Sequence, residues 1–393
     1  MERRTVDSCG NSTSLKTPQR WSSARRLKPC PRKATVRSGN QQALASSFLL
    51  TAKIKSNSTH VTHVTLITKR GIKMKNITVL GAGVMGHGAA QLFAQAGKNV
   101  CIRARRETSL EKARELITNS FKMMVEKEML TENEMEQALV RITYTTDLLE
   151  SIQDTDFILE SIPEVLEQKL ETYEIIEGAV SDKTIISSNT STFPLEELTQ
   201  RAKHPERFII THFFNPPQLV PIVEIAKFEK TTENVVNTTY DLMKEIGKSP
   251  VVLNKEITGF IVNRVQVAML REAFHLIEEG VATAEDIDIA MKGSMGFKWA
   301  FCGPMESQDL AGLETTQAMV GNIMQDLSNT RDVPSFLSEM VENEHHGIRT
   351  NQGFYNYDDH GEKAIKTRDD SFLDLLKLQK SKANREKSVS SIE

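Results

Sequence analysis

The sequence of 393 residues is poor in cysteine and has no long apolar run. Its four cysteines, Cys9, Cys30, Cys101 and Cys302, lie far apart and form no C-x-x-C pair. That spacing argues against a disulfide framework or a zinc site and is typical of a reducing compartment. The best apolar stretch, at 43–52, is half the length of a membrane span and contains two serines, so we expect no membrane partner.

Acidic residues are scarce in the first 73 positions. This segment holds fifteen Lys and Arg against two acids, a net charge of +13, which leaves −16 for positions 74–393 of a chain whose total is −3. We therefore expect no nucleic-acid partner for the folded part. Because the segment also lacks periodicity, residues 1–73 are predicted to be a basic, disordered extension. Met74, directly before a strand pattern, favours a natural start there and a cytoplasmic protein, whereas a genuine Arg- and Ser-rich transit peptide would indicate mitochondria.

The stretch 75–106 organises the rest of the chain. Apolar residues at 77–80 predict a buried strand, and Gly81, Gly83 and Gly86 follow in G-x-G-x-x-G spacing. An alanine-rich amphipathic segment then ends at Gly97, before an extended pattern at 99–103. In this order the glycines permit a tight turn, close approach to a pyrophosphate and close helix–strand packing. The stretch predicts dinucleotide binding, and the plainer alternative is a tight turn without a ligand.

The remaining sequence predicts two domains. A helical pattern spans 108–149, a further helix is expected at 166–180, and short apolar runs predict strands at 157–159, 184–187, 208–211 and 222–225. This alternation favours a mostly parallel sheet, so 74–257 is predicted to be an α/β Rossmann-type domain. Past Pro250 the patterns are helical, at 261–279, 284–292 and 306–328, with a glycine-rich turn at 293–296. We expect an all-α domain at 258–378 and a polar tail at 379–393.

Two polar clusters follow predicted strands, S-S-N-T-S at 187–191 and T-H-F-F-N-P-P at 211–217. The carboxyl ends of strands face the ligand crevice in open α/β sheets. His212 is the natural general base for oxidising an alcohol, because its ordinary pKa lies near neutrality. Glu224 could orient the imidazole, and Ser191 and Asn215 could hydrogen-bond the reacting oxygen. The plainer alternatives are a structural histidine, a solvated glutamate and a simple turn.

Several motifs in one order then identify a family. They are G-A-G-V-M-G (81–86), E-S-I-P-E (160–164), S-N-T-S (188–191), H-F-F-N-P (212–216), V-E-I (223–225), G-F-I-V-N-R (259–264) and G-F-Y-N-Y (353–357). Over 74–358 the chain resembles the L-3-hydroxyacyl-CoA dehydrogenase family, in particular its 3-hydroxybutyryl-CoA dehydrogenases. The resemblance implies a Rossmann-type domain, a helical dimerisation domain and a homodimer. It also implies interconversion of an L-3-hydroxyacyl-CoA and its 3-keto form in fatty-acid metabolism, by hydride transfer to NAD(P).

The resemblance assigns roles to individual residues. It implies that His212 is the catalytic acid/base, that Glu224 pairs with it, and that Ser191 and Asn263 contact the substrate oxygens. The residues that it implies for binding the cofactor are Gly81, Gly83, Val84, Met85, Gly86, Glu164, Lys169 and Ser191. No metal is expected, because hydride transfer requires none and the adjacent His345 and His346 have no ligand set around them.

One departure from the family concerns the cofactor. The strand after the glycine loop normally ends in an acid that binds the ribose 2′-hydroxyl, but Ala104 stands at the matching position within R-A-R-R. Arg103, Arg105 and Arg106 could accommodate a 2′-phosphate, which an acid would repel. The sequence therefore leaves NAD, the family default, and NADP both open, with Glu107 as a possible substitute for the missing acid.

A second departure concerns the substrate. The segment G-F-K-W-A-F-C-G-P-M-E-S (296–307) looks more like the gulonate and carnitine dehydrogenase branch, which uses free polar 3-hydroxy acids. The helical segment after Thr108 has no lysine-rich patch for CoA phosphates, although Lys112, Lys122 and Lys127 could serve. A free hydroxy acid is thus an alternative to the acyl-CoA substrate. A cofactor-binding protein without catalysis is the second alternative.

Overall fold

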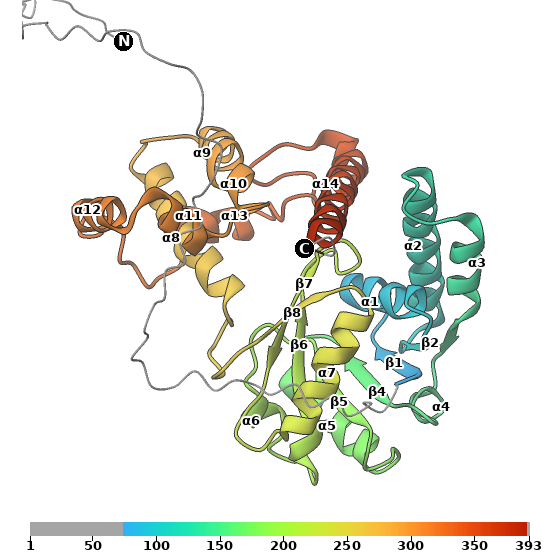
Figure 1. Cartoon of the computed structure of the whole chain (residues 1–393). Coiled ribbons are helices and arrows are strands. Elements are labelled where there is room, and N and C mark those ends of the chain that lie inside the picture. Colours follow the sequence, from blue (N-terminus) through green and yellow to red (C-terminus); the bar gives the residue numbers. More distant parts are fainter. Residues whose placement is uncertain (1–73, 391–393) are drawn as a thin grey trace, which may run out of the picture. The chain divides into compact units, whose positions relative to one another are not determined.

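The computed structural model describes residues 74–390, so the predicted extension 1–73 and the last three residues lie outside the described part. An eight-stranded sheet forms the centre of the α/β domain, in the order β3-β2-β1-β4-β5-β6-β7-β8 (Figure 1). Six of its seven pairings are parallel, and only β6 and β7 are antiparallel. The mostly parallel sheet and the helical C-terminal part confirm the predicted fold class.

The strands are β1 (Asn76–Leu80), β2 (Asn99–Arg103), β3 (Ile142–Thr145), β4 (Phe157–Glu160), β5 (Ile185–Ser188), β6 (Phe208–Phe213), β7 (Ile222–Ala226) and β8 (Ser249–Val252). The helices that accompany them are α1 (Val84–Gln95), α2 (Glu107–Glu126), α3 (Glu132–Val140), α4 (Leu148–Ser151), α5 (Leu166–Glu177), α6 (Leu195–Leu198), η1 (Pro205–Arg207) and α7 (Glu233–Glu245).

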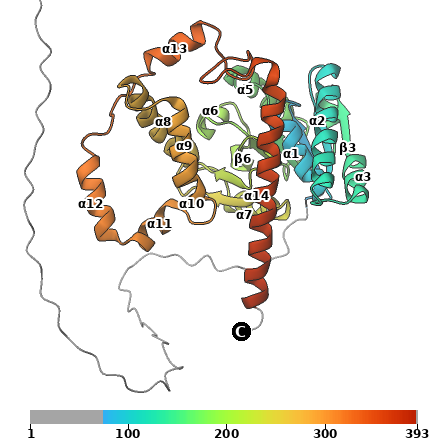
Figure 2. The ribbon, with the colours of Figure 1, turned by 90° about the horizontal axis from the view of Figure 1, so that it is seen from above.

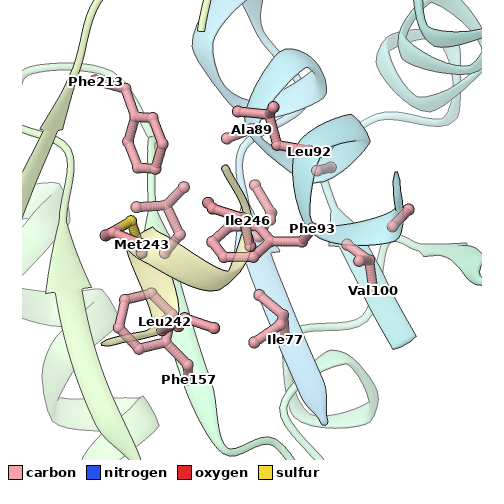
Figure 3. Close-up of a cluster of buried hydrophobic side chains, with 14 of the residues drawn as sticks. Ile77, Ala89, Leu92, Phe93, Val100, Phe157, Phe213, Leu242, Met243 and Ile246 are labelled. Atoms are coloured by element: carbon pink, nitrogen blue, oxygen red, sulfur yellow. The ribbon is translucent and has the colours of Figure 1, made fainter. Parts of the chain in front are cut away.

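Two apolar cores hold the sheet between its helices. One joins β1, β2 and β4 to α1, α2 and α7, and Figure 3 shows part of it, with Phe93 and Phe157 beside Leu242 and Ile246. The other joins β4, β5 and β6 to α5 and α6. Because both faces of the sheet are covered, every residue of the central strands β4, β5 and β6 is buried, and most of them are apolar, as expected for a parallel sheet.

The prediction of one helical region over 108–149 is wrong. The chain forms α2 and α3, separated at 127–131, and then β3, which pairs in parallel with β2. Thr131 ends the break with a capping box to Glu134, which fixes the start of α3. Only the first residue of β3 is buried, so this edge strand carries no apolar run that a sequence pattern could reveal.

Strand β8 was also not predicted, because it contains Pro250. Proline cannot donate a backbone hydrogen bond and is confined to edge strands or bulges. The strand β8 pairs only with β7 and lies at the edge of the sheet, where this missing donor is tolerated.

The C-terminal part is helical. Its elements are α8 (Val262–Glu278), α9 (Ala284–Met291), η2 (Lys292–Gly296), α10 (Phe297–Trp299), α11 (Pro304–Ala311), α12 (Leu313–Ile323), α13 (Ser335–Glu342), η3 (Asp358–His360) and α14 (Gly361–Ser390). Two predictions are corrected here. The expected helix 306–328 is interrupted at Gly312, whose φ of +92° favours glycine, and the expected turn at 293–296 is a π-helical segment, η2.

Helix α14 is one uninterrupted helix (Figure 2). It continues past Leu378 into the segment predicted as a polar tail. None of the helices within 74–390 is long and apolar enough to cross a bilayer.

Candidate active site

The glycine turn between β1 and α1 forms a cradle of backbone atoms. Gly81 has a φ of +112°, and a Cβ built on it would lie 2.3 Å from the carbonyl oxygen of Ser161. A Cβ on Gly86 would lie 1.8 Å from the carbonyl oxygen of Gly81, so α1 can approach the strand only because residue 86 is glycine. A Cβ built on Gly83 would have no other atom within 4 Å, and Val84 beside it is exposed. Open backbone N–H groups at a helix start fit the pyrophosphate of a dinucleotide.

A buried carboxylate lies at the end of β4, next to this cradle. Glu160 is fully buried, and its Oε1 accepts hydrogen bonds from Lys169 Nζ at 2.7 Å and from the backbone N–H of Ile162 at 2.9 Å. Its Oε2 accepts from Tyr173 Oη at 2.5 Å and from Ser188 Oγ at 2.7 Å. Burial and the adjacent Glu160 charge raise the pKa of Tyr173 well above its usual value, so the phenol remains a donor. Glu160 thereby ties β4, α5 and β5 together.

Glu164 and Lys169, two of the residues predicted to bind the cofactor, contact each other at 3.1 Å. Lys169 is 1% exposed and its ammonium also binds Glu160, whereas the Glu164 side chain is 38% exposed. Burial opposes ionisation of Glu164, but hydrogen bonds from Thr190 and Thr192 and the charge of Lys169 outweigh it, so its pKa lies below the usual value. Of this pair, Glu164 is therefore the member with surface to offer a ligand.

His212 lies at the end of β6, directly across from Glu224 on β7 in the antiparallel register. The imidazole Nδ1 is 2.9 Å from Glu224 Oε2, and Nε2 is 3.0 Å from Ser191 Oγ. A carboxylate only accepts hydrogen bonds, so Glu224 fixes the proton on Nδ1 and leaves the Nε2 lone pair toward Ser191. The structure thus brings three residues predicted from sequence into one hydrogen-bonded row. Their site roles stay predictions.

Glu224 also binds the start of α8. Its Oε1 accepts hydrogen bonds from the backbone N–H groups of Ile261 at 2.9 Å and Val262 at 3.0 Å. Asn263 follows Val262 directly and is half-buried, so the second predicted substrate residue lies one position past the amide that Glu224 holds. Phe260 packs against the imidazole with the ring centroids 5.2 Å apart.

Two other residues predicted for the site, Asn215 and Met85, take no part in this hydrogen-bonded row. Asn215 is exposed at the cis Asn215–Pro216 bond, and Met85 is half-buried in the first turn of α1. Within residues 74–390, no group of three or more His, Cys, Asp or Glu is arranged to hold a metal ion.

Sequence reasoning missed two contributors to this region. Glu160 gave only a weak signal, an acid closing the apolar run F-I-L-E, because its partners come from α5 and β5. The amides of Ile261 and Val262 gave none, since a backbone N–H does not depend on residue type. Asn189, inside a motif that was recognised, accepts from the backbone N–H of Phe213 at 2.9 Å and so joins the ends of β5 and β6.

A Rossmann-type sheet with a glycine cradle, and a histidine near the carboxyl end of β6 that is paired with a carboxylate on β7, define a dinucleotide-dependent dehydrogenase. Residues 76–257 match the 3-hydroxyacyl-CoA dehydrogenase NAD binding domain, and residues 259–357 match the C-terminal domain of the same family. The chain belongs to the 3-hydroxyacyl-CoA dehydrogenase family, oxidoreductases that act on CH–OH groups with NAD.

Relatives within the family act on different substrates. The mitochondrial hydroxyacyl-coenzyme A dehydrogenase of Homo sapiens is 34% identical over 293 residues, which are 73% of this chain and 92% of that protein. The 5-formyl-3-hydroxy-2-methylpyridine 4-carboxylate 5-dehydrogenase of Mesorhizobium japonicum is 32% identical over 292 residues, 74% of this chain and 94% of that protein. A solved structure of an enzyme with that activity, described as an NAD⁺-dependent dismutase, gives a TM-score of 0.73 at 31% identity, covering 78% of this chain and 98% of that one. The (S)-3-hydroxybutyryl-CoA dehydrogenase structure from Ralstonia eutropha gives 0.59 at 32%, covering 72% and 99%.

Proposed function

We propose that the protein interconverts an L-3-hydroxyacyl-CoA, of short chain such as 3-hydroxybutyryl-CoA, and its 3-ketoacyl-CoA in fatty-acid metabolism. The observation that carries this proposal is the row Glu224–His212–Ser191, in which Ser191 follows the end of β5, His212 lies near the end of β6, and Glu224 lies opposite His212 on the antiparallel strand β7. When bound, a nicotinamide dinucleotide supplies the hydride acceptor, and the residues of the glycine cradle would hold its pyrophosphate.

In this proposal His212 takes the hydroxyl proton at Nε2 as the alcohol is oxidised and returns it in the reverse direction. Glu224 keeps the imidazole in the required tautomer and stabilises its charged form. Ser191 Oγ lies 3.0 Å from Nε2, which supports a role for its hydroxyl in binding the reacting substrate oxygen. Asn263 contributes an amide from the first turn of α8.

A free hydroxy acid is the second candidate, and the surroundings of α2 favour it. Lys127, one of three lysines considered for CoA phosphates, binds Asp374 of α14 at 3.0 Å. The open groove along α2, of about 620 Å³, is lined by Glu107, Glu111, Arg114, Glu115, Thr118, Asn119 and Lys122. Three carboxylates against two cations give no positive surface for the phosphates of CoA. The Mesorhizobium relative, named for a pyridine carboxylate, agrees with this reading.

A substrate panel separates the candidates. We expect oxidation of 3-hydroxybutyryl-CoA when it is offered beside gulonate and carnitine, each with NAD and with NADP, followed by absorbance of the reduced nucleotide. Exclusive turnover of a free acid would move the proposal to the second candidate. No turnover of any compound, with nucleotide binding retained, would favour a binding protein without catalysis.

We also propose that a second copy of the chain covers the helical domain. None of the residues of α8 to α13 is buried in the single chain, and large apolar side chains such as Met305, Phe297 and Leu310 are 75% to 78% exposed. Apolar surface of this extent marks an association site. It supports the homodimer expected from the family resemblance.

Sedimentation equilibrium tests the dimer. The chain of 44.1 kDa should sediment at about twice that mass at micromolar concentration. Leu310→Asp should shift it toward the monomer, because an unpaired charge resists burial. Val140→Asp is the matched control, since Val140 on α3 is equally exposed and lies in the α/β domain. A wild-type mass of one chain would contradict the proposal.

A further inference from the structure

The end of β2 lies beside the glycine cradle. Leu80 and Arg103 are register partners, and the backbone N–H of Gly81 donates to the carbonyl oxygen of Arg103 at 2.8 Å. Residues 104–106 therefore leave the sheet at the edge where the cradle opens. In dinucleotide-binding folds this position recognises the adenosine ribose, and the side chains found there distinguish a 2′-hydroxyl from a 2′-phosphate.

No carboxylate occupies this position. Ala104 is 7% exposed, and its methyl group belongs to the apolar core of the sheet. An acid that accepts from a ribose 2′-hydroxyl, the usual basis of NAD preference, is therefore absent from the residue that follows β2.

Three arginines surround Ala104 in sequence. Arg103 is half-buried and its Nε donates to the carbonyl oxygen of Thr146 at 3.2 Å, whereas Arg105 and Arg106 are exposed. Among residues 74–390, no carboxylate lies within ion-pair distance of any of the three. Burial and the charge of Arg105 lower the pKa of Arg103, and the charge of Asp147 opposes this shift in part. Positions 74–393 carry a net charge of −16, so three arginines within four residues contrast with the charge of the rest of the folded part.

We infer that the dinucleotide site of this chain prefers NADP(H) to NAD(H), with Arg105 and Arg106 binding the 2′-phosphate and Arg103 supporting the positive field beside them. Guanidinium groups bind phosphate through paired, charge-assisted hydrogen bonds, and the apolar Ala104 removes the repulsion that an acid would exert. This inference rests on the proposed dinucleotide-dependent dehydrogenase. It concerns only the residues that bind the adenosine ribose of the dinucleotide, and the proposed proton transfer at His212 is the same with either cofactor.

Isothermal titration calorimetry without substrate tests the inference. We expect NADPH to bind at least about tenfold more tightly than NADH, and 2′,5′-ADP more tightly than 5′-AMP, because the 2′-phosphate is the only difference in each pair. The advantage of NADPH should shrink as KCl is raised, since exposed charges are screened.

Variants locate the effect. Arg105→Ala and Arg106→Ala should each weaken NADPH on the order of tenfold and leave NADH unchanged, and Ala104→Asp should reverse the preference. Arg331→Ala, an exposed arginine of the helical domain, is the matched control and should change neither affinity. Glu107→Gln tests whether Glu107 replaces the missing acid, in which case NADH binding would fall instead.

The outcomes are distinguishable from failure of the proposed function. Equal or tighter binding of NADH, or arginine variants with unchanged NADPH affinity, would overturn the inference while the dehydrogenase proposal stands. Failure of both nucleotides to bind would overturn both.

Discussion

His212→Asn should lower kcat by about 10²–10⁴-fold, the range that general acid–base catalysis contributes. Asparagine preserves a polar side chain at the end of β6 but cannot take up the proton that Nε2 accepts in the proposed reaction. The carboxylate of Glu224, which accepts the hydrogen bond from Nδ1, then has no imidazole to orient, so the loss falls on kcat rather than on cofactor affinity. The measurement is steady-state kinetics with the substrate that the panel identifies, together with the NADPH dissociation constant.

His204→Asn is the control for this substitution. The His204 side chain is 49% exposed and its Nδ1 lies 3.2 Å from Glu206 on the surface of the α/β domain, so its loss should leave kcat unchanged. A His212→Asn enzyme that retains more than a tenth of the wild-type kcat while remaining folded would remove His212 from the mechanism.

Glu160→Gln should destabilise the protein by roughly 3 kcal/mol, because it breaks a buried ion pair and leaves the Lys169 charge uncompensated on one side. Both side chains are at most 1% exposed, and Glu164 alone remains beside the ammonium at 3.1 Å. The substitution also disturbs the bonds to Tyr173 and Ser188 that hold α5 and β5. Urea denaturation followed by circular dichroism would show a lower midpoint.

Glu167→Gln makes the same chemical change in an exposed ion pair, between Glu167 of α5 and Arg201, which follows α6. Exposed ion pairs contribute little, because water and salt screen them. We expect the midpoint of this control to stay near the wild-type value. If both variants lowered the urea midpoint equally, burial of the ion pair between Glu160 and Lys169 would not explain the loss of stability.

The first part of the fold could be predicted almost residue by residue because its signals are local. The apolar run at 77–80, the three glycines and the extended pattern at 99–103 correspond to β1, the cradle and β2. Strands β3 and β8 could not be predicted, since each lies at an edge of the sheet and is only partly buried. Their pairing is decided by a neighbouring strand and leaves no apolar run in the sequence.

The site shows the same division. Ser191, His212 and Glu224 were predictable as a group because each lies on or directly after one of three strands that are neighbours in the sheet, β5, β6 and β7. The donors that hold Glu224 from α8 were not, because they are backbone groups 37 and 38 positions away. The hydrogen bonds that Glu160 accepts likewise come from residues up to 28 positions away, which only folding brings together.

In the proposed dimer, the hydrogen bonds from the amides at the start of α8 to Glu224 would couple proton transfer to subunit assembly. Helix α8 has no buried residue in one chain, and the proposed second copy would hold it more firmly. Dilution that separates the two copies would loosen α8 and release one oxygen of the carboxylate that orients His212. Each subunit would then be a competent acid–base catalyst only while its neighbour is bound, and specific activity would become a function of protein concentration.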